Sequence, residues 1–248
     1  MAIDIIWLES TDSTNKEALR RFAELTDFTI LAAEYQTEGR GQKGTSWESA
    51  KGTNLTFSLV LKPEMIKAEN QFIISQIAAV GVFEYLKSKG IEAKIKWPND
   101  IYINNKKVAG ILIENTIEGD TLSGSIVGIG LNLNQDKFES NAPNPVSIKM
   151  VTGERYDLKE EMEKLAFFLY DLYIPFKNFS CGSISEKISS MYHRNLYRYE
   201  ELHKFQETPS GEIFEGRIIG TDKNACLQIE KLDGTVSSYA FKEIKYII

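Results

Sequence analysis

The last 54 residues of the chain, 195–248, contain short extended runs and no helical periodicity, which sets them apart from everything before them. Turn sequences separate these runs at 208–211, 221–224 and 233–234. About 50 residues of this kind are typical of a small β-barrel module. We therefore expect two domains, residues 1–194 and residues 195–248, with the second domain built from strands.

The first 194 residues mix extended and helical patterns. Hydrophobic runs predict strands over 1–9, 28–35 and 54–61, followed by a strand meander over 93–132. Turns in the meander are expected at 104–105 and 118–120. Apolar spacing predicts helices over 13–25 and 72–87. A third helix is expected from the capping residue Asp157 to Pro175, which ends or kinks it, and a further helical segment runs to about residue 193. The expected fold is α+β, a mixed or antiparallel sheet with packed helices.

Composition excludes several classes of protein. The chain of 248 residues has 35 acidic and 29 basic residues, a net charge of −6, which argues against a partner held mainly through nucleic-acid phosphates. Two cysteines and two histidines are too few for a disulfide framework, a zinc cluster or a His-rich metal site. We see no secretory signal and no membrane-spanning run, so we expect a soluble, cytoplasmic protein without a membrane partner.

A long glycine-rich loop over residues 36–53 is the first candidate site. Glycines let backbone N–H groups converge on an anion, and Arg40 and Lys43 add positive charge. A basic surface loop without a ligand is the alternative. The loop matches neither a Walker A motif nor a dinucleotide fingerprint, because no helix follows it in the required place. Trp47 could fill a gap in the core or cover a flat ligand.

The second candidate site combines polar residues with strands. Asn99 and Asp100 follow Trp97-Pro98, and Lys107 opens an otherwise apolar strand. Buried polar groups cost about 1–3 kcal/mol each when they lack a partner, so these residues need a turn, a metal ion, a ligand or one another. A structural ion pair between Asp100 and Lys107 is the alternative to a functional role.

Two further segments are suggestive. Gly128 and Gly130 alternate along a predicted strand, which leaves one face bare, so that a ligand or another backbone can approach; a bulge or tight sheet packing is the alternative. Residues 12–15 stand at a predicted helix start, where capping is the usual role. Their hydroxyl and amide groups also suit an uncharged polar ligand.

Together these motifs resemble the biotin–protein ligase family, in order and spacing, over about residues 8–190. The trailing β module matches the layout of that family as well. The motifs that carry the resemblance are Asp12-Ser13-Thr14-Asn15, Ala33-Glu34-Tyr35-Gln36, Gly39-Arg40-Gly41, Lys96-Trp97-Pro98-Asn99-Asp100, Lys107-Val108-Ala109-Gly110 and Gly128-Ile129-Gly130-Leu131-Asn132.

The resemblance implies a catalytic domain like that of class II synthetases, followed by an SH3-like β-barrel. It also implies a two-step reaction that uses ATP, Mg²⁺ and biotin. Biotin is first activated as biotinyl-5′-AMP, and a lysine of a biotin carboxyl carrier domain of a carboxylase then takes the biotinyl group. Such chemistry needs cations and backbone donors rather than a Ser, Cys or His nucleophile, in agreement with the residues present.

Residue roles follow from the same resemblance. The implied catalytic residues are Lys107, Arg40 and Asp100, with Asp100 also a candidate Mg²⁺ ligand or contact to the target lysine. The implied biotin-binding residues are Ser13, Thr14, Asn15, Gln36, Gly39, Arg40, Gly41, Gln42, Trp47, Lys107, Gly110, Gly128 and Gly130. The implied nucleotide-binding residues are Arg40, Trp47, Asn99, Lys107 and Asn132.

The chain departs from the family pattern in its loop and at its start. Many members have arginine where this loop has Gln42 and Thr45, which puts adenylate retention in question, although Lys43 could compensate. The chain begins directly at the expected catalytic domain, so the resemblance is to members without an N-terminal DNA-binding domain, and we expect no DNA partner.

Three other functions remain open from sequence alone. A lipoate–protein ligase or octanoyl transferase would share the architecture, but its substrate has no ureido group to match Ser13, Thr14 and Gln36. A biotin-binding or adaptor protein would need no Arg40 and Lys107 together. A nucleic-acid-binding function is favoured by the terminal β module alone. The sequence does not reveal the oligomeric state, the carrier protein, or whether the loop 36–53 is ordered without ligand.

Overall fold

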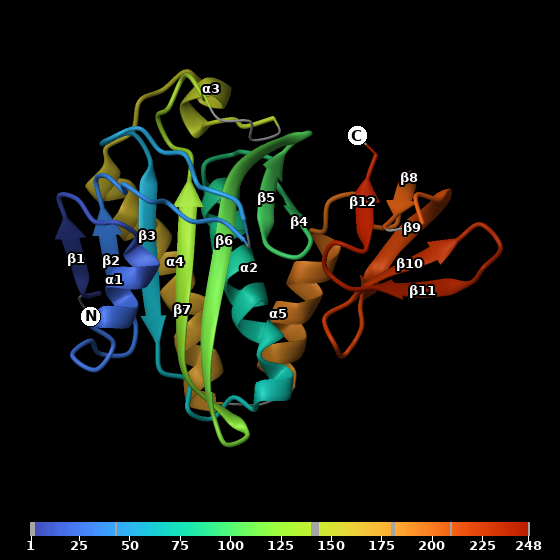
Figure 1. Ribbon diagram of the computed structural model, residues 1–248, viewed down its shortest axis with the longest axis horizontal. Coiled ribbons are helices and arrows are strands. Elements are labelled where there is room, and N and C mark those ends of the chain that lie inside the picture. Colours follow the sequence, from blue (N-terminus) through green and yellow to red (C-terminus); the bar gives the residue numbers. More distant parts are fainter. Residues whose placement is uncertain (1–2, 43, 140–143, 180–181, 209, 248) are drawn as a thin grey trace.

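The computed structural model describes residues 3–42, 44–139, 144–179, 182–208 and 210–247. They form a large mixed sheet with helices on both faces and, beside it, a smaller antiparallel sheet (Figure 1). This confirms the predicted mixed sheet, the packed helices and the C-terminal β structure. The division at residues 194 and 195 into two domains stays a prediction.

The large sheet has seven strands in the order β1-β2-β3-β7-β6-β5-β4. β1 runs parallel to β2, and the other neighbours are antiparallel. The predicted meander forms β4 to β7, with turns at Asn104 and Gly119, both of which have positive φ. The strands are β1 (Ile5–Leu8), β2 (Thr29–Ala33), β3 (Leu55–Leu61), β4 (Lys94–Lys96), β5 (Asp100–Ile103), β6 (Lys106–Glu118) and β7 (Thr121–Leu131).

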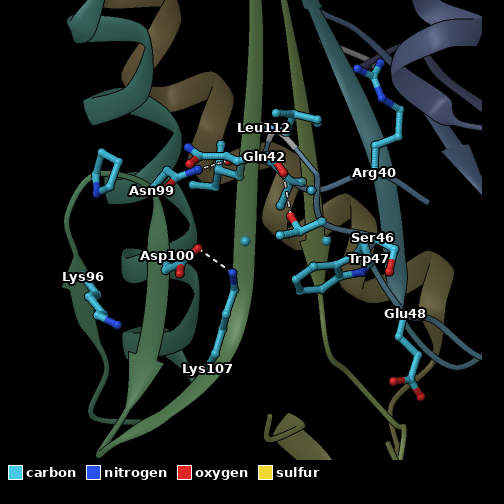
Figure 2. Close-up of a pocket in the computed structure, with 18 of the residues that line it drawn as sticks. Arg40, Gln42, Ser46, Trp47, Glu48, Lys96, Asn99, Asp100, Lys107 and Leu112 are labelled. Carbon is cyan, nitrogen blue, oxygen red and sulfur yellow. Dashed lines mark hydrogen bonds and ion pairs between the residues drawn. The ribbon is translucent and has the colours of Figure 1, made fainter. Parts of the chain in front are cut away.

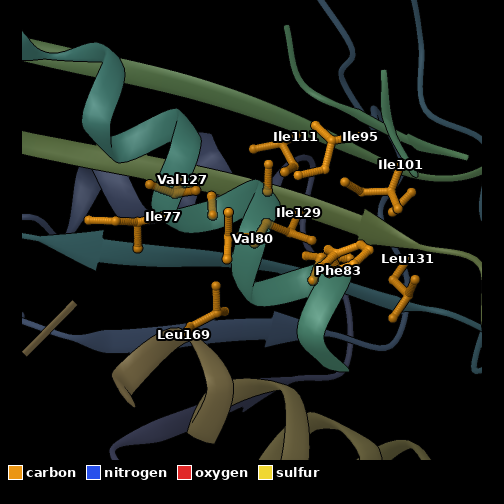
Figure 3. Close-up of a cluster of buried hydrophobic side chains, with 14 of the residues drawn as sticks. Ile77, Val80, Phe83, Ile95, Ile101, Ile111, Val127, Ile129, Leu131 and Leu169 are labelled. Atoms are coloured by element: carbon orange, nitrogen blue, oxygen red, sulfur yellow. The ribbon is translucent and has the colours of Figure 1, made fainter. Parts of the chain in front are cut away.

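Helices cover both faces of this sheet, which explains why every residue of β2 and β3 is buried. α1 lies on one face, where Ala18 packs into a small cluster with Leu31 and Val60. α2 and α4 lie on the other face and enclose the main core, in which the Leu169 side chain of α4 points toward α2 and lies against Gly81 (Figure 3). The helices are α1 (Thr14–Arg20), η1 (Ala68–Asn70), α2 (Phe72–Ser88), α3 (Ile148–Thr152), α4 (Leu158–Phe179) and α5 (Gly182–Arg194).

Two helices differ from the predicted limits. α1 ends at Arg20: the Arg21 N–H still donates to the Glu17 carbonyl, but the Phe22 N–H donates to the Leu19 carbonyl, three residues back, and Leu25 packs from a turn instead. α4 runs through Pro175 to Phe179, so the proline does not end it. Asp157 does cap α4, because its Oδ1 accepts from the N–H groups of Lys159 and Glu160.

The second sheet has five antiparallel strands in the order β11-β10-β9-β8-β12. It lies beside β4 and α5 (Figure 1). Trp97 Nε1 donates to the Ala225 carbonyl at 3.0 Å, and Ile95 forms a bridge with Leu196, so the segment around β4 is fixed to both parts. The strands are β8 (Leu202–Glu207), β9 (Ile213–Thr221), β10 (Leu227–Lys231), β11 (Val236–Tyr239) and β12 (Ile244–Tyr246).

The described helices do not support insertion into a membrane. Across the described residues, none of them combines the length and the apolar character that crossing a bilayer requires.

Candidate active site

One cavity brings the predicted motifs together. It has a volume of about 950 Å³ and is bounded by the start of α1, the loop 36–53, the faces of β6 and β7, and the second sheet. Every predicted site residue lines it except Gly39 (Figure 2). Its lining includes Ser13, Thr14, Asn15, Gln36, Arg40, Gly41, Gln42, Trp47, Asn99, Asp100, Lys107, Gly110, Gly128, Gly130 and Asn132. Motifs separated by more than 100 residues therefore share one space.

The N-terminus of α1 forms an uncharged hydrogen-bonding corner of the cavity. Ser13 holds the capping position, but its hydroxyl makes no capping bond. Instead, Gln36 Oε1 accepts from the N–H of Thr14 at 2.8 Å and from its hydroxyl at 3.2 Å. Ser58 donates to Asn15 Oδ1 at 2.6 Å, which fixes the buried Asn15 side chain. The predicted capping role thus belongs to Gln36, a residue 22 positions away in the sequence.

The glycines of β6 and β7 make a face without side chains. Gly110 and Gly130 are direct partners in the strand pairing. The Trp47 ring lies against both, and a Cβ atom added at Gly130 would collide with it. Gly128 is covered by the Asn15 side chain in the same way. The bare face therefore accepts close packing of a flat group, which in this structure is the Trp47 indole.

Lys107 and Asp100 form an ion pair on the other side of the cavity. Nζ of Lys107, on β6, lies 2.6 Å from Oδ1 of Asp100, on β5. Both side chains are about one quarter exposed, at 25% and 26%. The ammonium also lies 5.6 Å from the centre of the Trp47 ring. The structural ion pair considered from the sequence is present, and it stands inside the cavity rather than in the core.

Arg40 lies apart from this pair. Its Nη1 is 3.2 Å from Oε1 of Glu114, and Figure 2 shows the guanidinium on the opposite side of the cavity from Lys107. Glu114 also accepts from Asn15 Nδ2 at 2.8 Å, so one carboxylate joins α1 to the glycine-rich loop. Gly39 does not line the cavity, because it packs against the backbone of Trp47, whose N–H donates to the Gly39 carbonyl at 2.9 Å.

Three buried polar atoms at this cavity have no hydrogen-bond partner among the residues that the structure describes. They are Trp47 Nε1, Asn132 Oδ1 and the Tyr246 hydroxyl. Such an atom costs about 1–3 kcal/mol when it stays unpaired. Three of them around one cavity are therefore readily explained by a polar ligand that would supply their partners.

The sequence and the fold are similar to those of known proteins. The model of the biotin/lipoate A/B protein ligase family matches residues 7–132. The chain belongs to this family. The bifunctional ligase/repressor BirA of Escherichia coli strain K12 is 30% identical over 241 residues, which covers 94% of the chain and 71% of BirA.

The chain matches a smaller part of some other relatives, and it is also similar to solved structures. BirA of Bacillus spizizenii is 36% identical over 154 residues, and the chain spans about half of that relative, 46%. Among solved structures, a biotin protein ligase from Aquifex aeolicus, in complex with biotin and ATP, has a TM-score of 0.79. It is 25% identical and covers 98% of this chain and 99% of that one. The chain therefore shares the fold of this biotin protein ligase over 98% of its length.

In this member of the family, the second sheet also supplies part of the cavity wall. Phe241, Ile244, Lys245 and Tyr246 line the cavity from the C-terminal end of the chain. No local pattern marks them, since they reach the site only through the packing of one sheet beside the other. Lys96 also lines the cavity; it belongs to the motif at residues 96–100, and the sequence predicts no role for it.

The asparagine side chains already use part of their hydrogen-bonding capacity. The Asn99 amide donates to the Ile111 carbonyl, and Asn132 Nδ2 donates to the Val146 carbonyl at 3.1 Å. Asn132 Oδ1 remains available to a ligand. Lys43, considered as a compensating cation, lies outside the described residues. The nucleotide roles predicted for Asn99 and Asn132 stay predictions.

Proposed function

We propose that the chain is an ATP-dependent biotin–protein ligase, which activates biotin as biotinyl-5′-AMP and transfers it to a lysine of a biotin carboxyl carrier domain. The observation that carries this proposal is the make-up of one cavity. An uncharged hydrogen-bonding corner, a strand face without side chains and a lysine ammonium stand around the same space. The names of the relatives, among them a biotin--[acetyl-CoA-carboxylase] ligase of Paracoccus denitrificans, support the same conclusion.

The corner at α1 is suited to the ureido ring of biotin. The bonds from Thr14 hold the Gln36 carbonyl, so the amide group has one orientation and its NH₂ can donate to a ligand oxygen. The hydroxyls of Ser13 and Thr14 add a donor and an acceptor. The bicycle would then rest on the glycine face, which requires the Trp47 ring to shift from Gly110 and Gly130 and cover the ligand.

Activation is a phosphoryl-transfer reaction with biotin as the nucleophile. A carboxylate oxygen of biotin forms a bond to the α-phosphorus of ATP, and the bond to the bridging oxygen breaks with its electron pair on pyrophosphate. Catalysis of such a step is mostly positioning and charge stabilisation. Lys107 would stabilise the charge at the carboxylate and the α-phosphate. Arg40 would support it after leaving Glu114.

Transfer follows at the same place. The neutral amine of the target lysine attacks the carbonyl carbon of the mixed anhydride, and AMP leaves with the electron pair of the cleaved carbon–oxygen bond. The amine must lose its protons during the reaction, and a carboxylate nearby can orient the amine and accept a hydrogen bond from it. Asp100, beside Lys107, is the residue to which we assign this contact.

The described residues do not form a protein-built magnesium site. No group of three or more Asp, Glu, His or Cys residues in the described part of the chain is arranged to hold a metal ion. The carboxylates at the cavity are those of Glu48 and Asp100, and Asp100 is paired with Lys107. Since Mg²⁺ commonly reaches such sites on substrate phosphates, we assign it no protein ligand, and the predicted metal role of Asp100 stays a prediction.

Lipoate ligation is the alternative function within the family. Lipoate has no ureido group to pair with Thr14 and Gln36. A site with buried hydrogen-bonding groups rejects an analogue without the matching group by as much as about 10⁴-fold. The hydrogen-bonding corner therefore favours biotin over lipoate and over an octanoyl group.

The test is mass spectrometry of a purified biotin carboxyl carrier domain after incubation with the protein, ATP and Mg²⁺. Parallel reactions contain biotin or lipoate. We expect a mass increase equal to biotin less one water, at one lysine, in the biotin reaction. Modification by lipoate would support the alternative function, and pyrophosphate release without any modified carrier would contradict the transfer step.

A further inference from the structure

Lys96 is a cation of the cavity that has no ion-pair partner in the described part of the chain. It is the last residue of β4 and pairs in register with Asp100 of β5. Its Nζ donates to the Tyr102 hydroxyl at 3.0 Å, and within the described ranges no carboxylate lies at ion-pair distance from it. Lys107, by contrast, is matched by Asp100 at 2.6 Å. The two lysines therefore differ in how much of their charge is available to an anion.

The surroundings of Lys96 withhold water from the ammonium without neutralising it. The ammonium lies 4.6 Å from the centre of the Tyr102 ring and 5.0 Å from that of Tyr246. Burial lowers the pKa of Lys96, and Lys107 and Arg198 act in the same direction, while Asp100 opposes them. A partly desolvated ammonium gains strongly when an anion becomes its partner. The Tyr246 hydroxyl, unpartnered and at the same cavity, can donate to that anion as well.

The strand order shows where Lys96 lies relative to Lys107 and the glycine face. Gly110 of β6 pairs with Asp100 of β5, which pairs with Lys96 of β4. Neighbouring strands lie about 4.8 Å apart, so Lys96 is two strands away from the glycine face. Figure 2 shows Lys96 on the same side of the cavity as Lys107 and Asp100, away from Trp47. An anion bound there extends outward from the bond that reacts at Lys107.

We propose that Lys96 is a further catalytic residue, which binds the β- and γ-phosphates of ATP and stabilises pyrophosphate as it leaves. This inference rests on the proposed ligase function. When the carboxylate oxygen bonds to the α-phosphorus, the electron pair of the broken bond goes to the β-phosphate oxygen. Lys96 acts on that oxygen and its neighbours, whereas Lys107 acts on the α-phosphate. Lys96 therefore serves activation and has no part in the transfer of biotin from the adenylate.

The experiment compares the two half-reactions in three variants. Lys96→Gln removes the charge, Lys96→Arg keeps it, and Lys94→Gln is the matched control, because Lys94 is exposed on the same strand and does not line the cavity. Activation is measured as biotin-dependent pyrophosphate release. Transfer is measured with preformed biotinyl-5′-AMP and a carrier domain, without ATP. The reverse of activation is measured with biotinyl-5′-AMP and inorganic pyrophosphate.

We expect Lys96→Gln to slow pyrophosphate release by about 10²–10³-fold, the usual effect of losing one group that stabilises developing charge. Transfer from the adenylate should stay at the wild-type rate. The pyrophosphate concentration that half-saturates the reverse reaction should rise by roughly tenfold or more. Lys96→Arg should recover much of the activation rate, and Lys94→Gln should match the wild type in every assay.

Several results would overturn the proposal. One is activation at the wild-type rate in Lys96→Gln. Another is an equal loss of both half-reactions, which would indicate a structural role for Lys96 or a contact with the adenylate. A wild-type protein that releases no pyrophosphate with biotin would instead contradict the ligase function, and the role of Lys96 would fall with it.

Discussion

The Lys107 ammonium and the Asp100 carboxylate, 2.6 Å apart, belong to neighbouring strands and share one wall of the cavity. An ion pair that solvent can still reach contributes little to stability, about 1 kcal/mol. Its position therefore matters more for chemistry than for folding. In the proposed mechanism, Asp100 neutralises the Lys107 charge until an anionic substrate arrives, and its carboxylate lies next to the place where the amine would attack.

The first prediction concerns Lys107. Lys107→Ala should slow adenylate formation by about 10²–10³-fold, because the lost charge acts mainly in the transition state. Biotin affinity should change little, since the uncharged corner at α1 remains. Biotin-dependent pyrophosphate release and calorimetric titration with biotin measure the two effects. Lys106→Ala, at the exposed neighbouring position, is the control. Pyrophosphate release at the normal rate in Lys107→Ala would exclude this residue from the mechanism.

The second prediction concerns the glycine face. Gly130→Ala places a methyl group where the Trp47 ring now lies, so the ring or the ligand must move away. Overpacking of this kind costs about 1–3 kcal/mol, which corresponds to a roughly 5- to 150-fold loss of biotin affinity. Calorimetric titration measures the loss. Gly182→Ala is the control, because a methyl group there meets no atom within 4 Å. Unchanged affinity in Gly130→Ala would mean that the ligand does not use this face.

The third prediction concerns Gln42, where many family members have arginine. The Gln42 backbone carbonyl accepts from Thr45 N–H at 2.9 Å and from its hydroxyl at 2.7 Å, so a tight turn presents the Gln42 side chain to the cavity. A charge-assisted bond exceeds a neutral one by about 1 kcal/mol. Gln42→Arg should therefore release biotinyl-5′-AMP several-fold more slowly while forming it at a similar rate.

Escape of the adenylate is measured as nonspecific modification of a bystander protein without a carrier domain. Gln42→Glu has the same size and the opposite charge, and it should leak more than the wild type. Equal leakage from all three proteins would show that the loop retains its intermediate by another contact.

The fourth prediction concerns His193, which joins α5 to the second sheet. Its Nε2 lies 2.9 Å from the Thr221 hydroxyl, and burial lowers the pKa of His193 below the ordinary 6.5. The unfolded chain therefore binds the proton more readily than the folded one, and stability should fall as the pH drops below 6.5 toward the folded pKa. The slope from this group is at most about 1.4 kcal/mol per pH unit.

Denaturant unfolding between pH 7 and pH 5 tests this. His193→Gln can keep the hydrogen bond to Thr221 and cannot titrate, so its stability should depend less on pH. The same slope in His193→Gln would remove His193 from the acid sensitivity of the protein.

Much of the fold could be predicted because the determining signals are local. The buried runs of β2 and β3, the apolar surface of α2 and the turns at Asn104 and Gly119 all follow from neighbouring residues. The site motifs could be found for a related reason. An unpaired polar group inside an otherwise apolar strand costs free energy, and a glycine weakens the strand. Each such residue therefore indicated a position with a special role.

The remaining features depend on contacts between distant residues. Gln36 caps α1 across 22 positions, and Arg40 turns to Glu114 across 74. Nothing near Tyr246 indicates that its ring lies over Lys96, since the second sheet must first pack beside β4. The end of α1 at Arg20 was missed because Phe22 and Leu25 continue the apolar pattern from a turn.

The direct pairing of Gly110 with Gly130 also bears on how the sheet assembles. A slip of one residue between β6 and β7 would turn Ile111 or Ile129 toward the cavity and close it. In the proposed binding mode, biotin requires the correctly aligned strands, and by mass action its binding favours that alignment. Biotin would stabilise the native register of the two strands during folding, so protein made in its presence should contain fewer misfolded chains.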